Sequence, residues 1–117
     1  MASAALCFEI LGEGMDGVFP SGSLLECVDY AELGREPEDG DYVLAEHRSE
    51  IGETKISCYR FVTTDDGSML INEPKETMYQ REFPIAAYEG AAGHRIVAYV
   101  MSYHLGGLPA AAETLSS

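Results

Sequence analysis

The chain has 117 residues, of which 46% are hydrophobic, and a net charge of −13 from 20 acidic and 7 basic side chains. A chain of this length forms one domain with its own core, and its dispersed apolar residues exclude a disordered acidic tail and a membrane-spanning segment. The basic residues are scattered singly, which excludes direct binding of this chain to nucleic-acid phosphates.

The N-terminal residues lack the basic flank and the long apolar centre of a secretory signal. We therefore expect a cytoplasmic protein, with residues 1–9 as a lead-in segment. The three cysteines, Cys7, Cys27 and Cys58, are odd in number and widely spaced, which predicts reduced thiols. Residues 36–41 and 65–67 are acidic but lack the spaced ligands of a calcium loop, so no metal or cofactor is expected.

Short strand patterns recur along the chain. They are predicted over residues 5–11, 23–29, 42–47, 54–62, 69–72 and 94–103. Residues 48–53 form a polar hairpin connection, and the Asp66-Gly67 pair favours a tight hairpin in which both central residues have positive φ. The last pattern is nearly continuous in β-formers, as expected for a strand buried on both faces or lying in an interface.

The connections between these strands read as loops. Residues 30–38 form a polar connection closed by Pro37, and residues 73–92 form a long surface connection with room for one short strand. Residues 105–117 are expected to be a flexible tail with a helical turn over residues 110–115. The pattern predicts a mostly-β small domain of five to seven short strands with little helix.

Residues 12–22, Gly-Glu-Gly-Met-Asp-Gly-Val-Phe-Pro-Ser-Gly, have the shape of an active-site turn. They are followed by Gly-Asp-Tyr-Val at residues 40–43 and by Cys-Tyr-Arg-Phe at residues 58–61. Leu-Ile-Asn-Glu-Pro at residues 70–74, Phe-Pro-Ile at residues 83–85 and the strand from residue 95 follow in turn. This order resembles the C-terminal domain of LexA and lambda-type phage repressors, the S24 peptidases, over residues 10–104.

That family has a Gly-Asp-Ser-Met loop and a Val-Lys-Arg-Leu strand, whose serine attacks a peptide bond and whose neutral lysine accepts the proton. The matching positions here hold Gly14 and Tyr59. Glycine has no nucleophile, and a phenol with a pKa of about 10 is a poor base at neutral pH. Lys55 lies four strand residues from Tyr59, about 13 Å away, and Ser21 occupies a variable position of the family loop.

The resemblance therefore implies a pseudo-peptidase rather than an enzyme, in which Met15 and Phe19 serve the fold. It implies a cleavage-incompetent dimerisation or oligomerisation domain of a phage-type transcriptional repressor, with DNA bound through a separate N-terminal helix-turn-helix domain. An antirepressor protein, rather than self-cleavage, would relieve repression, and a cleft vacated at Gly14 and Tyr59 is one place for it to bind.

The resemblance also places a homodimer interface along the terminal strand. The candidate residues are Arg95, Val97, Tyr99, Met101 and Tyr103. Aromatic and methionine side chains contribute large contact areas to interfaces. The alternative is that these side chains fill the core of the domain.

Two other functions stay open from the sequence. One is an active S24-type serine autopeptidase, in which Gly14 is an engineered change or another base is used. Its candidate groups are the bases His47, His94 and His104 and the nucleophiles Ser21 and Cys58, although their spacing matches no nucleophile motif. The other is a stand-alone acidic phage protein that binds a partner.

Overall fold

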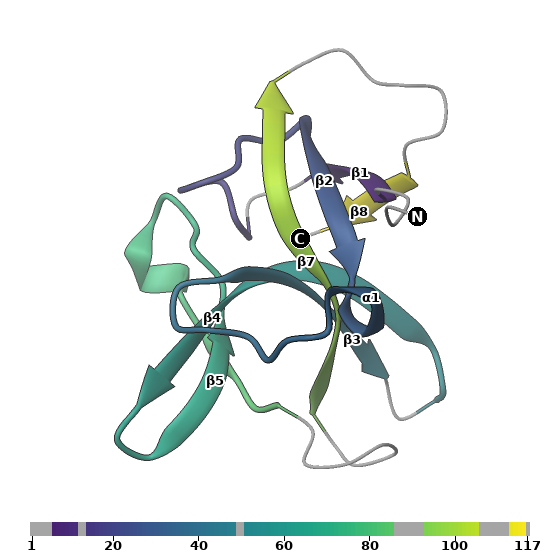
Figure 1. The fold of residues 1–117 in the computed structure, drawn as a ribbon. Helices are drawn as coiled ribbons and strands as arrows, with labels where there is room; N and C mark the ends of the chain where they lie inside the picture. The colour runs from purple at the N-terminus through teal and green to yellow at the C-terminus, as the bar shows by residue number, and fades with distance from the viewer. Residues whose placement is uncertain (1–5, 12–13, 49–50, 86–92, 106–112, 117) are drawn as a thin grey trace.

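The structure is a computed structural model that describes residues 6–11, 14–48, 51–85, 93–105 and 113–116. Its strands are β1 (Leu6–Leu11), β2 (Ser23–Asp29), β3 (Tyr42–Arg48), β4 (Thr54–Thr64), β5 (Gly67–Ile71), β6 (Glu82–Phe83), β7 (His94–Leu105) and β8 (Glu113–Ser116) (Figure 1). Helix α1 (Tyr30–Leu33) and a 3-10 turn (Thr77–Tyr79) are short, which confirms the mostly-β class with little helix. Neither helical segment within these ranges is long and apolar enough to span a membrane.

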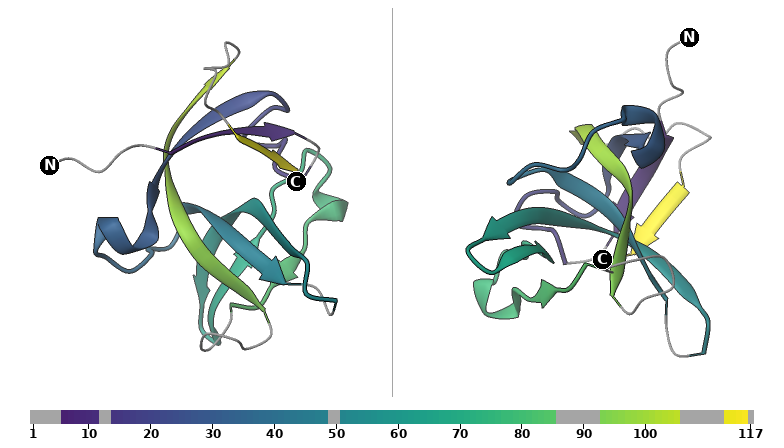
Figure 2. Two further views of the ribbon diagram at one scale, coloured as in Figure 1. Left: turned by 90° about the vertical axis from the view of Figure 1, so that its right-hand side faces the viewer. Right: turned by 60° about the horizontal axis from the view of Figure 1, so that its bottom comes forward.

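The described strands form one sheet in the order β6-β5-β4-β3-β7-β2-β1-β8. All neighbouring pairs are antiparallel except β1 and β8, which run parallel. The sheet curls strongly, so that β8 at one edge comes close to β4 (Figure 2). Strand β7 lies at the centre of the sheet and pairs with both β3 and β2.

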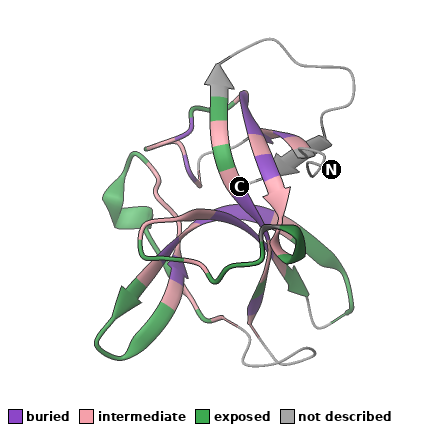
Figure 3. Cartoon of the chain, in the orientation of Figure 1, coloured by how far each residue is buried: buried purple, intermediate pink, exposed green. Residues whose placement is uncertain are grey.

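Apolar side chains gather into two clusters in the sheet, and the buried segments lie along its central strands (Figure 3). The first cluster contains Phe8, Ile10, Met15, Phe19, Leu25, Cys27, Leu44, Cys58 and Ala98. The second cluster contains Val43, Ala45, Tyr59, Phe61, Leu70 and Tyr99. Successive strand residues point to opposite faces, so adjacent residues such as Cys58 and Tyr59 enter different clusters.

Strand β7 carries two bulges that the sequence did not reveal. Val97 is skipped in the pairing with β3, and Met101 is skipped in the pairing with β2. An extra residue in one strand bends that strand and increases its twist. The bulges therefore lie where β7 bends between its two partners, since its first half pairs with β3 and its second half pairs with β2.

Two local expectations need correction. The polar connection after residue 29 contains α1, because the Asp29 carboxylate accepts a hydrogen bond from the Ala31 N–H at 2.9 Å and Gly34 ends the helix with φ of 71°. The hairpin between β4 and β5 is present, but its two-residue loop is Asp65-Asp66. Only Gly67, with φ of 125°, has positive φ there.

The expectation of a flexible tail is wrong for residues 113–116. These residues form β8 and pair with β1 over Phe8–Leu11, where we expected part of a helical turn. The sheet thus includes residues on both sides of the 10–104 span that the resemblance covers. The long connection after β5 does hold one short strand, β6, while its residues 86–92 lie outside the described ranges.

Candidate functional site

The opening loop of residues 14–22 is fastened to the segment that follows β5. The Gly17 N–H donates to the Glu73 carbonyl oxygen at 2.8 Å, and the Lys75 N–H donates to Asp16 Oδ1 at 2.7 Å. Met15 and Phe19 are 1% and 3% exposed and lie in the first cluster. Both residues therefore serve the fold, as the sequence predicted.

Gly14 lies at a pocket of about 360 Å³ between these two segments. The pocket is lined by Gly14, Asp16, Asn72, Pro74, Lys75, Glu76 and Tyr79. Gly14 brings no side chain to this pocket, so the position that the resemblance assigns to a serine supplies no nucleophile. Tyr59 is not among the lining residues.

Tyr59 instead packs in the second cluster. Its ring makes edge contacts with Phe83 and His94, with both centroid distances at 5.1 Å. Burial raises the pKa of its phenol, Cys58 raises it further, and a hydrogen bond with Ser57 opposes the shift. At neutral pH the phenol is thus even more fully protonated than that of free tyrosine, and Tyr59 does not line the pocket at Gly14.

A polar group that the sequence did not predict lies beside the first cluster. The Arg60 guanidinium lies 3.7 Å from the Glu73 carboxylate. The backbone carbonyl of Glu73 also accepts the hydrogen bond from the Gly17 N–H in the opening loop. Burial and a hydrogen bond to Glu73 raise the pKa of the Tyr42 phenol to about 12. Glu73 thereby joins strands β3 and β4 to the opening loop.

The histidines do not assemble with the buried thiol of Cys58. His94 is 7% exposed and stacks on His47 at 4.7 Å, on the Tyr59 side of β4. Burial lowers the pKa of His94 and the neighbouring His47 lowers it further, while the Pro84 carbonyl opposes the shift. Cys58 lies in the first cluster, so β4 separates its thiol from that imidazole.

The remaining candidates, Ser21, His104 and Lys55, lie in three different segments. Ser21 lies in the turn that leads into β2. His104 lies in β7, and the position of its side chain falls outside the described part of the chain. Lys55 pairs with His47 across β3 and β4 and is exposed to solvent. Of the autopeptidase candidates, the thiol of Cys58 and the imidazoles of His47 and His94 therefore lie on opposite sides of β4.

The thiols give a direct check on this geometry. Burial raises the pKa of Cys58 above the range in which thiols react and raises the pKa of Cys27 to about 12, whereas Cys7 is only half-buried. We expect one thiol of the native chain to react promptly with an aromatic disulfide reagent, and all three after unfolding. A Cys7→Ser variant that still reacted promptly in the native state, and that stopped reacting when Cys58 was also replaced, would restore Cys58 as a candidate nucleophile.

No protein family model, curated protein or solved structure matches this chain. The resemblance to S24 peptidases therefore rests on the order of the motifs along the sequence. The structure adds the location of each motif, with the opening loop against the segment after β5 and Tyr59 in the second cluster.

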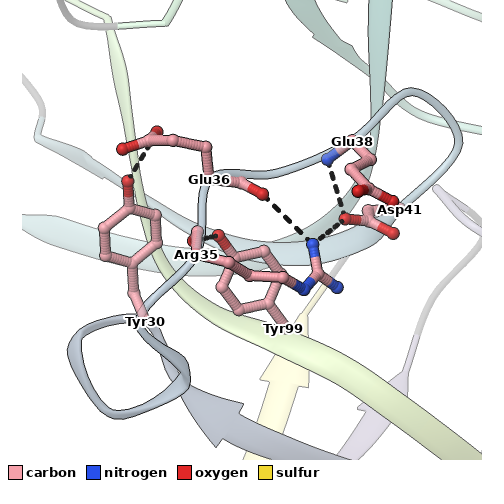
Figure 4. A network of polar contacts seen from close by, with 6 residues as sticks. All are labelled: Tyr30, Arg35, Glu36, Glu38, Asp41 and Tyr99. Atoms are coloured by element: carbon pink, nitrogen blue, oxygen red, sulfur yellow. Dashed lines mark hydrogen bonds and ion pairs between the residues drawn. The ribbon is translucent and has the colours of Figure 1, made fainter.

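The acidic segment of residues 36–41 makes hydrogen bonds within the domain. Arg35 Nη1 donates to Asp41 Oδ2 at 2.9 Å, and the Glu38 N–H donates to the same oxygen at 2.9 Å (Figure 4). Burial raises the pKa of Asp41, but these two donors outweigh it and lower the pKa below its usual value. In the described ranges, no three His, Cys, Asp or Glu side chains gather closely enough to hold a metal ion.

The five candidate interface residues fall into different environments. Tyr99 is 1% exposed, so its interpretation as a surface anchor is wrong and it belongs to the core. Met101 and Tyr103 are 55% and 47% exposed near the end of β7. Arg95 is exposed with its guanidinium 3.7 Å from Glu46, and Val97 packs partly against the first cluster.

Proposed function

We propose that this chain is a cleavage-incompetent, LexA-like assembly domain that pairs with a second copy of itself, as the C-terminal module of a phage-type transcriptional repressor. The observation that carries the proposal is the pair of exposed apolar side chains, Met101 and Tyr103, on the central strand of the sheet. The glycine at position 14 and the buried phenol of Tyr59 support a role without peptide cleavage.

The end of β7 offers a suitable surface for such pairing. The bulge at Met101 interrupts the ladder with β2, and the Tyr103 ring packs edge-on against Phe19 at 5.0 Å. The ring is therefore held in place by the core while much of its area stays open to solvent. Large side chains that are ordered before binding contribute to an interface with a small loss of entropy.

Pairing of two such domains would bring two separate N-terminal helix-turn-helix domains onto two half-sites of DNA. The acidic charge of the chain keeps this module away from the DNA backbone itself. Relief of repression would then require an antirepressor protein that binds the assembly domain. This places the regulatory event in protein–protein binding rather than in a bond cleavage.

The net charge gives self-association an unusual salt dependence. Two copies carry a charge of −26, twice the −13 of one chain, and like charges repel until salt screens them. The dimer should therefore become tighter as the ionic strength rises. Association with a basic partner would show the opposite trend.

We expect Met101→Asp to weaken self-association by about tenfold or more, because truncating a central apolar anchor and adding a charge costs more than about 1.4 kcal/mol. Sedimentation equilibrium measures the effect. The matched control is Met78→Asp, which places the same change on a side chain that is 77% exposed in the 3-10 turn.

The control variant should dimerise with nearly the wild-type affinity, and both variants should unfold at the wild-type denaturant midpoint. A wild-type chain that stays monomeric at millimolar concentration and high salt would contradict the proposal. If both variants weakened self-association equally, the dimer interface would not lie along β7.

A further inference from the structure

The segment from Asn72 to Arg81 forms a loop that closes on itself. The Asn72 N–H donates to the Arg81 carbonyl oxygen, and the Arg81 N–H donates in return to Asn72 Oδ1. Asn72 Nδ2 donates to the Tyr79 carbonyl at 3.2 Å, and Gln80 Nε2 donates to the Asn72 carbonyl at 3.3 Å. The 72–81 loop is therefore ordered by its own hydrogen bonds.

This loop presents two large apolar side chains to solvent. Met78 and Tyr79 are 77% and 60% exposed, on the 3-10 turn at the tip of the loop. Compact surface loops whose ends lie close together are often functional. Because the backbone that carries these exposed apolar groups is already ordered, a partner that binds them loses less conformational entropy.

The Gly14 pocket lies directly beside these side chains, since Tyr79 is one of its lining residues. Its lining residues include two that carry a carboxylate, Asp16 and Glu76, and one that carries an ammonium group, Lys75. Asp16 is fixed at the pocket by the hydrogen bond that its Oδ1 accepts from the Lys75 N–H. The excess of carboxylates over ammonium groups favours a cationic guest, and the ring of Tyr79 provides an aromatic neighbour for it.

We propose that the 72–81 loop and the Gly14 pocket form a docking site for a basic segment of another protein. A lysine or arginine side chain of that segment enters the pocket beside Glu76 and Tyr79, and an adjacent apolar side chain covers Met78. The charge of −13 steers such a segment toward the domain. Only the regulatory meaning of the contact, relief of repression, rests on the proposed function, while the binding itself does not.

The test is an NMR titration of the isotopically labelled full chain with the capped tripeptide lysine-leucine-lysine. We expect saturable shifts of the amide signals of residues 14–16 and 72–79, and a weaker response as salt is added. The capped tripeptide glutamate-leucine-glutamate is the probe of opposite charge and should leave these signals unchanged. This salt trend is opposite to that expected for the dimer, so the two proposals fail separately.

Two pairs of variants locate the binding. Glu76→Gln and Tyr79→Ala should each weaken peptide binding about two- to fivefold, the effect of losing one exposed ion pair or cation–π contact. Their controls are Asp66→Asn in the β4–β5 turn and Ile51→Ala, which alter an exposed carboxylate and an exposed apolar side chain elsewhere. The controls should bind the peptide with the wild-type affinity.

Several outcomes would overturn the proposal. They are the absence of saturable shifts at the loop and pocket, equal binding of the acidic tripeptide, and equal weakening by Asp66→Asn and Glu76→Gln. The last of these would show that the basic peptide only senses the overall negative charge. Because Glu76 and Tyr79 are exposed, their variants should keep the wild-type unfolding midpoint, and the titration then reports on binding alone.

Discussion

Replacing Tyr99 with alanine should lower the free energy of unfolding by about 3–5 kcal/mol, the usual cost of removing a large aromatic side chain from a core. The ring is 1% exposed, stacks with Tyr30 at a centroid distance of 5.6 Å and lies 4.9 Å from the Arg35 guanidinium carbon. Its hydroxyl donates to the Arg35 carbonyl oxygen at 2.6 Å (Figure 4). Denaturant unfolding followed by circular dichroism measures the loss.

Two milder changes separate the contributions. Tyr99→Phe keeps the ring and removes one hydrogen bond, which should cost about 0.5–1.5 kcal/mol. Met101→Ala removes an exposed side chain two residues along β7 and should leave stability nearly unchanged. If Tyr99→Ala kept the wild-type stability and abolished self-association, Tyr99 would be an interface residue, as the sequence suggested.

Sequence patterns gave most strands because β-branched and aromatic runs between turn residues depend on local chemistry. The short helix α1 was missed although Asp29 and Gly34 are ordinary start and stop signals, since four residues show no helical periodicity. Strand β8 could not be foreseen. Its pairing with β1 joins residues about a hundred positions apart, and a four-residue segment has no pattern that selects a distant parallel partner.

In the candidate site, too, features set by neighbouring residues could be predicted from the sequence, whereas features set by the tertiary fold could not. Met15 was assigned to the core from its place in the opening loop, and its side chain is buried there. The alternation of Cys58 and Tyr59 between two faces follows from strand period alone, but which face meets the opening loop depends on how the sheet curls. The ordered 72–81 loop was not predicted from the sequence. It is held by hydrogen bonds of Asn72 to residues seven to nine positions further along the chain, and no local pattern indicates such contacts.

Gly17→Ala should destabilise the domain by about 1–3 kcal/mol, the cost of forcing an extra methyl group into packed structure. A methyl group at Gly17 would come within 2.6 Å of the Glu73 carbonyl oxygen and 3.0 Å of the Pro74 carbonyl oxygen. Both are backbone atoms, so the opening loop must move away from the segment after β5. That movement would stretch the hydrogen bond from the Gly17 N–H to Glu73, now 2.8 Å long.

The matched control is Gly34→Asn, at the end of α1. An added side-chain carbon there meets no heavy atom within 4 Å, and asparagine tolerates the left-handed backbone that Gly34 adopts at φ of 71°. Its unfolding midpoint should stay near the wild-type value, while Gly17→Ala should lower the midpoint and also weaken binding of the basic tripeptide at the Gly14 pocket. Equal stability of the two variants would mean that the opening loop and the segment after β5 do not approach this closely in solution, and the docking site would lose one of its walls.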